Sequence, residues 1–126
     1  MIATPQKTIL IVDDDFAIRR LVEYCLRSLP VGQIAVTNGQ NALTVLRREK
    51  IDLVVTDLMM PEINGFDVVR SMRADPALQN IPVMLLSCQG NPELPAEAAA
   101  AGVQAYFMKP FSPSRLIETA RQLLAL

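Results

Sequence analysis

Apolar runs alternate along this chain with segments of helical periodicity. Five runs are short, rich in β-branched residues and typical of buried strands: residues 8–12, 34–36, 52–56, 82–86 and 105–108. The segments that follow them place apolar residues at intervals of three and four, the spacing of one face of a helix. Strands that alternate with helices in this way predict a parallel sheet.

The helix after the first run has the strongest pattern, with an apolar face of Ile18, Leu21, Val22, Cys25, Leu26 and Leu29. Pro30 should end it. Asn38 and Asn64, each followed by a glycine, announce the second and third helices. Ser112, followed by a proline, predicts the start of the last helix, because serine caps helices well and proline suits the first helical position.

The segment after residue 90 is the poorest helix candidate. Asn91 stands before a proline and could cap a helix, but Pro95 then falls in the first turn and an alanine run follows. Because few large side chains could anchor this helix to the sheet, we expect it to be mobile.

Length and topology rules narrow the fold. We expect residues 1–126 to form a single domain with a core from about residue 7 to residue 125 and no output domain, because two domains of half this length would barely offset chain entropy. Strands buried on both faces need helices on both sides, and right-handed crossovers leave few arrangements. We predict a flavodoxin-like α/β sandwich of five βα units with strand order 2-1-3-4-5.

Composition limits the chemistry. The chain has no histidine, which excludes a phosphohistidine intermediate on this chain and any His-ligated metal. Its 12 basic and 13 acidic residues form no basic stripe, so we expect no direct contact with nucleic acid. No apolar stretch approaches the ~20 residues of a membrane span, and the two cysteines, Cys25 and Cys88, lack metal-ligand spacing. We therefore expect a cytoplasmic protein.

Polar residues follow or end four of the apolar runs: Asp13, Asp14 and Asp15 after the first, Asp57 after the third, Ser87 after the fourth and Lys109 after the fifth. In the predicted strand order, all of them lie at one edge of the sheet, where ligands bind in such folds. Asp57 is then at the centre of the site, between the acidic residues on one side and the hydroxyl and ammonium groups on the other.

Carboxylates so close together repel one another by several kcal/mol at an effective dielectric constant of ~20, and one lysine cannot neutralise three. This arrangement favours a divalent cation. Since the available donors are oxygens and are few, Mg²⁺ with retained waters is the natural ion. A carboxylate nucleophile, a metal, an ammonium group and a hydroxyl donor together indicate phosphoryl transfer onto Asp57.

The residues ILIVDDD, LVVTDLMMPEINGFD, VMLLS and YFMKPF resemble the receiver domains of bacterial response regulators, and the resemblance spans essentially the whole chain. It implies that Asp57 is the phospho-acceptor. It also implies the following roles: Asp14 as a direct Mg²⁺ ligand, Asp13 as a ligand through water, the backbone carbonyl of Met59 as a further ligand, Ser87 and Tyr106 as switch residues, and Lys109 as the family's invariant lysine before a cis Pro110.

The resemblance implies partners as well. A sensor histidine kinase or a histidine phosphotransfer protein would donate the phosphoryl group, and acetyl phosphate could replace it. The modified Asp57 would draw Ser87 inward, Tyr106 would follow, and the face formed by the fourth helix, fifth strand and fifth helix would change its partner preference. The protein would catalyse only its own phosphorylation and dephosphorylation. The output partner and a phosphorylation-dependent dimer stay open.

Three positions depart from the family pattern or affect its rates. Cys88 stands where a small residue is usual, and a redox switch there has little support because Lys109 is its only evident basic neighbour. Met59 and Gln89 lie where side chains of this family control the approach of hydrolytic water. The apolar Met59 therefore implies an altered dephosphorylation rate, of either sign.

Taken singly, these residues have plainer interpretations: a helix cap for Asp15, a loop carboxylate for Asp57 and a solvated side chain for Lys109. Only their joint placement favours a site. Three alternative functions can be weighed against the same residues. A Mg²⁺-dependent phosphate-ester hydrolase would need an acid where Met59 stands. An interaction module that no longer accepts phosphate disagrees with the intact acidic set. Flavin binding disagrees with three aspartates where a phosphate would need donors.

Overall fold

Five parallel strands form a single sheet in the computed structural model, which describes residues 6–88 and 91–126. They are hydrogen-bonded in the order β2-β1-β3-β4-β5, which confirms the predicted topology. The strands are β1 Thr8–Val12, β2 Gly32–Val36, β3 Leu53–Asp57, β4 Val83–Ser87 and β5 Ala105–Met108.

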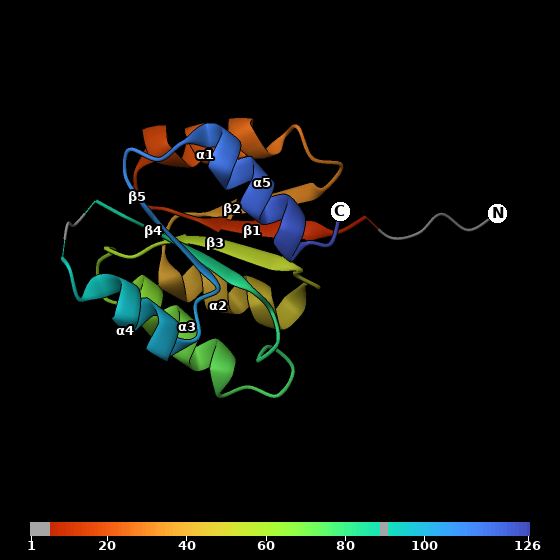
Figure 1. Cartoon of the computed structure of the whole chain (residues 1–126). Helices are drawn as coiled ribbons and strands as arrows, with labels where there is room; N and C mark the ends of the chain where they lie inside the picture. Colours follow the sequence, from red (N-terminus) through yellow and green to blue (C-terminus); the bar gives the residue numbers. More distant parts are fainter. Residues whose placement is uncertain (1–5, 89–90) are drawn as a thin grey trace.

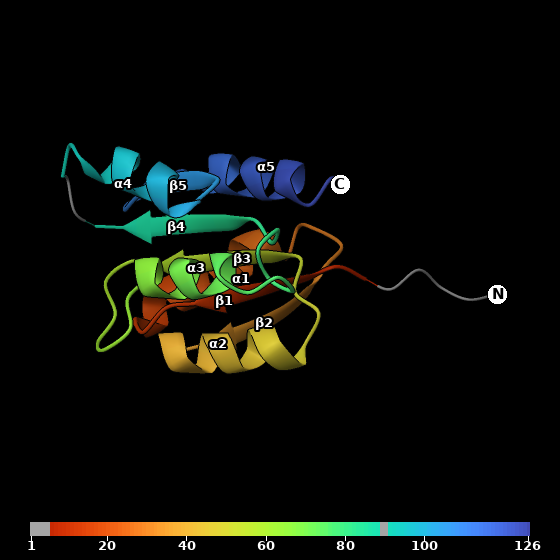
Figure 2. The same cartoon turned by 90° about the horizontal axis from the view of Figure 1, so that it is seen from below.

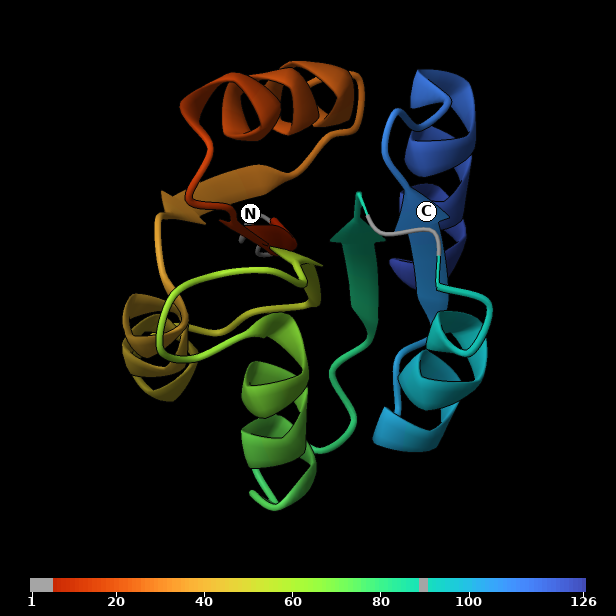
Figure 3. The same cartoon turned by 90° about the vertical axis from the view of Figure 1, so that its left-hand side faces the viewer.

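Helices cover both faces of this sheet. Helices α1 and α5 lie on one face, and α2, α3 and α4 lie on the other (Figures 1, 2 and 3). Their bounds are α1 Phe16–Leu26, α2 Gly39–Arg48, α3 Gly65–Arg73, α4 Leu94–Ala101 and α5 Pro113–Leu123. The architecture is the flavodoxin-like sandwich expected from the pattern. No helix in the described part of the chain has the length and apolar character that a membrane span requires.

The core is divided between the two faces because successive strand residues point in opposite directions. Ile9 and Ile11 of β1 pack in the cluster that includes α1 and α5, whereas Leu10 and Val12 pack in the cluster that includes α2 and α3. Strands β3 and β4 are buried along their whole length. This double burial explains why their sequences are almost continuously apolar instead of alternating.

Side-chain caps define the starts of four helices, as predicted. Asp15, Asn38 and Ser112 each accept a hydrogen bond from the backbone N–H three residues later, at 3.1, 2.7 and 3.4 Å. Asn64 and Asp67 form a reciprocal capping box at the start of α3. Each cap satisfies a backbone donor that the first helical turn leaves without a partner.

The first helix is shorter than predicted. It ends at Leu26, so Leu29 is a buried residue of the following loop and not part of the helical face. Leu21 is 42% exposed, because its neighbour Val22 takes the inward position of that turn. Strand β2 begins at Gly32, two residues earlier than predicted, since its backbone is already paired with β1 there.

Helix α4 begins later than predicted. The side chain of Asn91 accepts a hydrogen bond from the backbone N–H of Glu93 at 3.0 Å and so forms a turn before the helix. No side chain caps α4 itself, and its only buried residues are Leu94 and Ala98. The expected poor anchoring is therefore seen in its packing, while its mobility stays a prediction.

Gly65 places α3 directly against β3. A Cβ atom at this position would lie 2.6 Å from the carbonyl oxygen of Asp57 and 3.1 Å from Cα of Leu58, and backbone atoms cannot move aside cheaply. We expect Gly65→Ala to lower the free energy of unfolding by about 2–4 kcal/mol in urea titrations. Gly32→Ala is the matched control, because its Cβ would meet nothing nearer than 3.6 Å. Equal losses in the two variants would contradict this assignment.

Candidate functional site

The predicted site residues converge at the carboxyl edge of the sheet. The acidic residues Asp13 and Asp14 directly follow β1, and Asp57 is the last residue of β3. Ser87 is the last residue of β4, and Lys109 directly follows β5. Figure 3 looks onto this edge of the sheet. Side chains from four strands are therefore brought together, although they are separated by up to 96 positions along the chain.

Three carboxylates form the centre of the site. Asp13, Asp14 and Asp57 each offer an oxygen atom, and these oxygens all lie within 4.8 Å of one another. Asp13 and Asp57 are almost completely buried, with 1% and 6% exposure, whereas Asp14 is exposed. The cluster thus has two fixed carboxylates inside and one that faces solvent.

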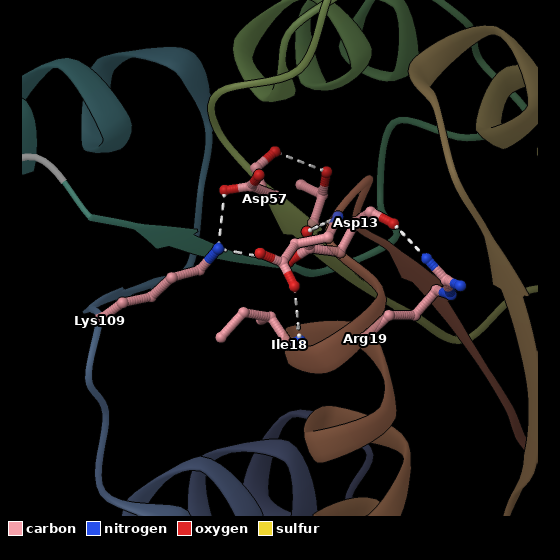
Figure 4. Close-up of polar contacts among 7 residues, drawn as sticks. Asp13, Ile18, Arg19, Asp57 and Lys109 are labelled. Carbon is pink, nitrogen blue, oxygen red and sulfur yellow. Dashed lines mark hydrogen bonds and ion pairs between the residues drawn. The ribbon is translucent and has the colours of Figure 1, made fainter.

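Lys109 joins the two buried carboxylates. Its Nζ atom lies 3.3 Å from Oδ2 of Asp13 and 3.2 Å from Oδ1 of Asp57 (Figure 4). Its backbone N–H donates to the carbonyl of Ser87 at 2.7 Å, and the following peptide bond, to Pro110, is cis as expected. The lysine backbone is therefore tied to the end of β4 while its side chain reaches the acids.

Asp13 is held by backbone contacts on both sides. Its Oδ1 atom accepts a hydrogen bond from the N–H of Asp15 at 2.8 Å, and its own N–H donates to the carbonyl of Val36 at 3.2 Å. The guanidinium of Arg19 donates to the Asp13 carbonyl at 3.0 Å (Figure 4). This role of Arg19 was not predicted, because a charged residue on a helix is ordinarily solvated.

The electrostatics of the site are dominated by burial and by like charge. Loss of solvent and, to a smaller extent, the charge of Asp13 raise the pKa of Asp57, Lys109 lowers it, and the net result is a pKa of about 6. Burial likewise raises the pKa of Asp13. Burial works against the ammonium of Lys109, but the charges of Asp13 and Asp57 outweigh it and raise the pKa of the lysine. At neutral pH the site therefore has more negative than positive charge, the condition that favours a bound cation.

The two predicted switch residues belong to neighbouring strands. Ser87 is completely buried at the end of β4. Tyr106 is half-buried on β5 and packs against a small apolar cluster on the face covered by α4: Leu58, Phe66, Leu85, Leu94 and Ala98. Their switching roles are not tested by this arrangement and stay predictions.

The β3–α3 loop contributes two features. Met59 is 49% exposed beside the site, and the role of its carbonyl as a metal ligand stays a prediction. Glu62 has a φ of +68°, a left-handed backbone conformation that is uncommon for residues other than glycine. With Asp14 and residues of the β2–α2 loop, Glu62 lines a cavity of about 230 Å³. Neither the cavity nor the left-handed conformation of Glu62 was predicted, because loop conformation leaves no periodic pattern in the sequence.

One position that departs from the expected pattern, Cys88, directly follows β4. Cys88 is exposed and is not disulfide-bonded, and its redox role stays untested. Gln89 lies outside the described residues. The proposed effects of Met59 and Gln89 on phosphate lifetime therefore stay untested.

Comparison with known proteins gives consistent matches. The family model of the response regulator receiver domain matches residues 9–121. Chemotaxis protein CheY-3 of Vibrio cholerae is 40% identical over 111 residues, which cover 87% of this chain and 85% of that protein. Chemotaxis protein CheY of Pseudomonas aeruginosa is 37% identical over 116 residues, with 91% and 94% coverage. The receiver domain of the Francisella response regulator 1452 has a TM-score of 0.87 at 27% identity and covers 94% of this chain and 97% of its own.

The raised pKa of Asp57 predicts a pH-dependent cost to stability. Because the folded value of about 6 exceeds the ordinary value of 3.8, ionised Asp57 destabilises the metal-free fold. The cost is complete above pH 6, shrinks as pH falls from 6 toward 3.8, and disappears below 3.8. We expect Asp57→Asn to raise the free energy of unfolding by about 1–3 kcal/mol near pH 7.5, and by much less near pH 4.5. Urea unfolding with a chelator present measures this. Asp75→Asn, in the loop after α3, is the control, and an Asp57→Asn gain that does not depend on pH would refute the argument.

Proposed function

The chain belongs to the response regulator receiver domain family, and from this membership we propose that Asp57 accepts a phosphoryl group from a histidine of a partner protein. It is a receiver domain of two-component signalling, a family of signalling proteins and not of enzymes in the ordinary sense. The observation that supports Asp57 most directly is its carboxylate, held by Lys109 at the centre of the three-carboxylate cluster. A sensor histidine kinase or histidine phosphotransfer protein is the donor, and acetyl phosphate can serve as a small substitute.

The proposed step exchanges one phosphorus bond for another. An Asp57 oxygen attacks the phosphorus of the donor phosphohistidine, an O–P bond forms, and the N–P bond breaks. The imidazole leaves with the bonding electrons and takes a proton from solvent. The ammonium of Lys109, 3.2 Å from the nucleophile, would pair with one oxygen of the incoming group, and the hydroxyl of Ser87 would donate to another.

The acidic cluster fits Mg²⁺ by the chemistry of its donors. All three side chains offer oxygen, and their oxygens lie within 4.8 Å of one another, as ligands of one ion would. We propose Asp14 and Asp57 as direct ligands, Asp13 as a ligand through water, and the Met59 carbonyl as a further one. When bound, Mg²⁺ would neutralise part of the acidic charge and draw charge from the transferred group.

The switch follows from the position of the phosphoryl group. Ser87 moves toward it, Tyr106 follows, and the surface of α4, β5 and α5 changes its preference for a separate partner protein. The exposed side chain of Met108 on β5 and the half-buried Tyr106 border an open pocket with Pro92 and Pro95 on this surface. An apolar surface of this kind suits a protein partner.

Replacement of Asp57 tests the proposal. We expect the wild type to gain one acid-labile phosphate when it is incubated with acetyl phosphate and Mg²⁺, and Asp57→Asn to gain less than about one-hundredth as much, because it lacks the nucleophile. Intact-protein mass spectrometry measures the gain. Asp75→Asn should match the wild type. Undiminished phosphate on Asp57→Asn would rule out this acceptor.

Removal of a carboxylate tests the metal assignment separately. Since Mg²⁺ binds only the folded site, it should stabilise the wild type by about 3 kcal/mol at a hundred times its dissociation constant. We expect Asp14→Asn to lose most of this gain, while Asp75→Asn keeps it. Thermal unfolding with and without Mg²⁺ measures the difference. If the ion stabilises Asp14→Asn and the wild type equally, Asp14 is not a ligand.

A further inference from the structure

Arg73, the last residue of α3, makes an unusual set of contacts at the edge of the sheet opposite the site. Its five guanidinium hydrogens correspond to five hydrogen bonds, all to oxygen atoms. Nε and Nη2 donate to the carbonyl of Gly102 at 3.2 and 2.7 Å. Nη1 donates to the carbonyls of Gln79 and Ile81 at 2.9 and 2.8 Å, and Nη2 also donates to Oε1 of Gln104 at 3.2 Å.

These contacts join the C-terminal end of α4 to the first residue of β4. Gly102 is the left-handed C-cap of α4, with a φ of +92°. The side chain of Gln104 accepts a hydrogen bond from the N–H of Val83 at 2.7 Å, and its backbone N–H donates to the Val83 carbonyl at 3.0 Å. Arg73 thus connects the end of α3, the end of α4 and the start of β4 through one planar group.

The other end of α4 is held differently. No side chain caps its start, and Leu94 is fixed by apolar packing with Leu58, Leu85 and Tyr106. This end lies toward the edge of the sheet where β4 ends and the site is found (Figures 2 and 3). Apolar packing has no preferred direction, whereas a guanidinium fork holds its acceptors in one plane. The end near the site can therefore repack at lower cost than the end near Arg73.

We propose that Arg73 fixes the C-terminal end of α4, so that phosphorylation moves the N-terminal end of the helix about Gly102 while the C-terminal end stays bound to β4. This proposal rests on the proposed function of Asp57. Arg73 is a positioning residue, because it touches none of the groups that react.

Hydrogen exchange measured with and without phosphate tests the proposal, with phosphate counted by intact mass in the same samples. In the wild type we expect phosphorylation to change exchange in residues 94–98 by at least about fivefold and in residues 99–104 by less than about twofold. Arg73→Lys keeps the charge but loses the fork. This variant should gain as much phosphate as the wild type. On phosphorylation, its hydrogen exchange in residues 99–104 should change as much as in residues 94–98.

Two further variants separate this role from simple loss of stability. Val22→Ala removes buried volume in α1, on the opposite face of the sheet, and should speed hydrogen exchange in general. Phosphorylation of this variant should still change exchange much more in residues 94–98 than in residues 99–104. Gly102→Ala disturbs the same contact from the other side, since its Cβ would lie 2.8 Å from Nε of Arg73, and it also strains the left-handed backbone at φ +92°; it should release the C-terminal end of α4 as Arg73→Lys does. It serves if Arg73→Lys does not fold.

The outcomes are distinct. The proposal that Arg73 fixes the C-terminal end of α4 would be overturned by one result in both Arg73→Lys and Gly102→Ala. That result is a normal gain of phosphate together with a change in hydrogen exchange that remains large in residues 94–98 and small in residues 99–104, as in the wild type. An equal response of both segments in the phosphorylated wild type would also overturn it. A wild type that gains no phosphate would instead overturn the proposed function, and the movement about Gly102 with it.

Discussion

The site depends on one ammonium group shared between two buried carboxylates. The Nζ atom of Lys109 lies within 3.3 Å of a carboxylate oxygen of both Asp13 and Asp57, and no other ion pair of the described residues involves these two carboxylates. Removing one partner from a buried charge cluster is costly, since the remaining charge keeps its desolvation penalty. The lysine makes the acidic arrangement tolerable, but one positive charge cannot balance three negative ones. The remaining imbalance is the physical reason why the site favours a divalent ion.

The fold makes this arrangement possible by placing Asp57 on a strand that is paired on both sides. Strand β3 lies between β1 and β4, so the acids that follow β1 and the residues that end β4 and follow β5 approach it from opposite directions. Burial of β3 on both faces keeps its end rigid. The close contact of Gly65 with the Asp57 carbonyl fixes the turn that leaves the strand. The position of the carboxylate is thus set mainly by the backbone, and only secondarily by its own hydrogen bonds.

Much of this could be predicted from the sequence, because strands and caps leave local signals. The five apolar runs, the caps Asp15 and Ser112, and the polar residues that follow the runs are all visible within a few positions of the chain. The strand order needed topology rules as well as the family resemblance. The fork of Arg73 could not be predicted, since it joins α3 to a carbonyl 29 positions away, and contacts between distant segments leave no period. The exposure of Leu21 and the left-handed Glu62 depend on packing and loop geometry, which composition does not encode.

The small apolar cluster on the α4 face explains how the site could affect a distant surface. Leu58 directly follows Asp57, Leu85 lies two residues before Ser87, and Leu94 begins α4, and all three pack in this cluster with Tyr106. A shift at the end of β3 or β4 therefore changes the space available to the tyrosine and to the start of the helix together. Close-packed interiors transmit such changes because they leave little free volume. Since α4 has only one other buried residue, Ala98, no larger apolar contact opposes repacking at its start. The same scarcity of large apolar side chains that makes α4 difficult to predict from the sequence leaves the start of the helix dependent on this one cluster.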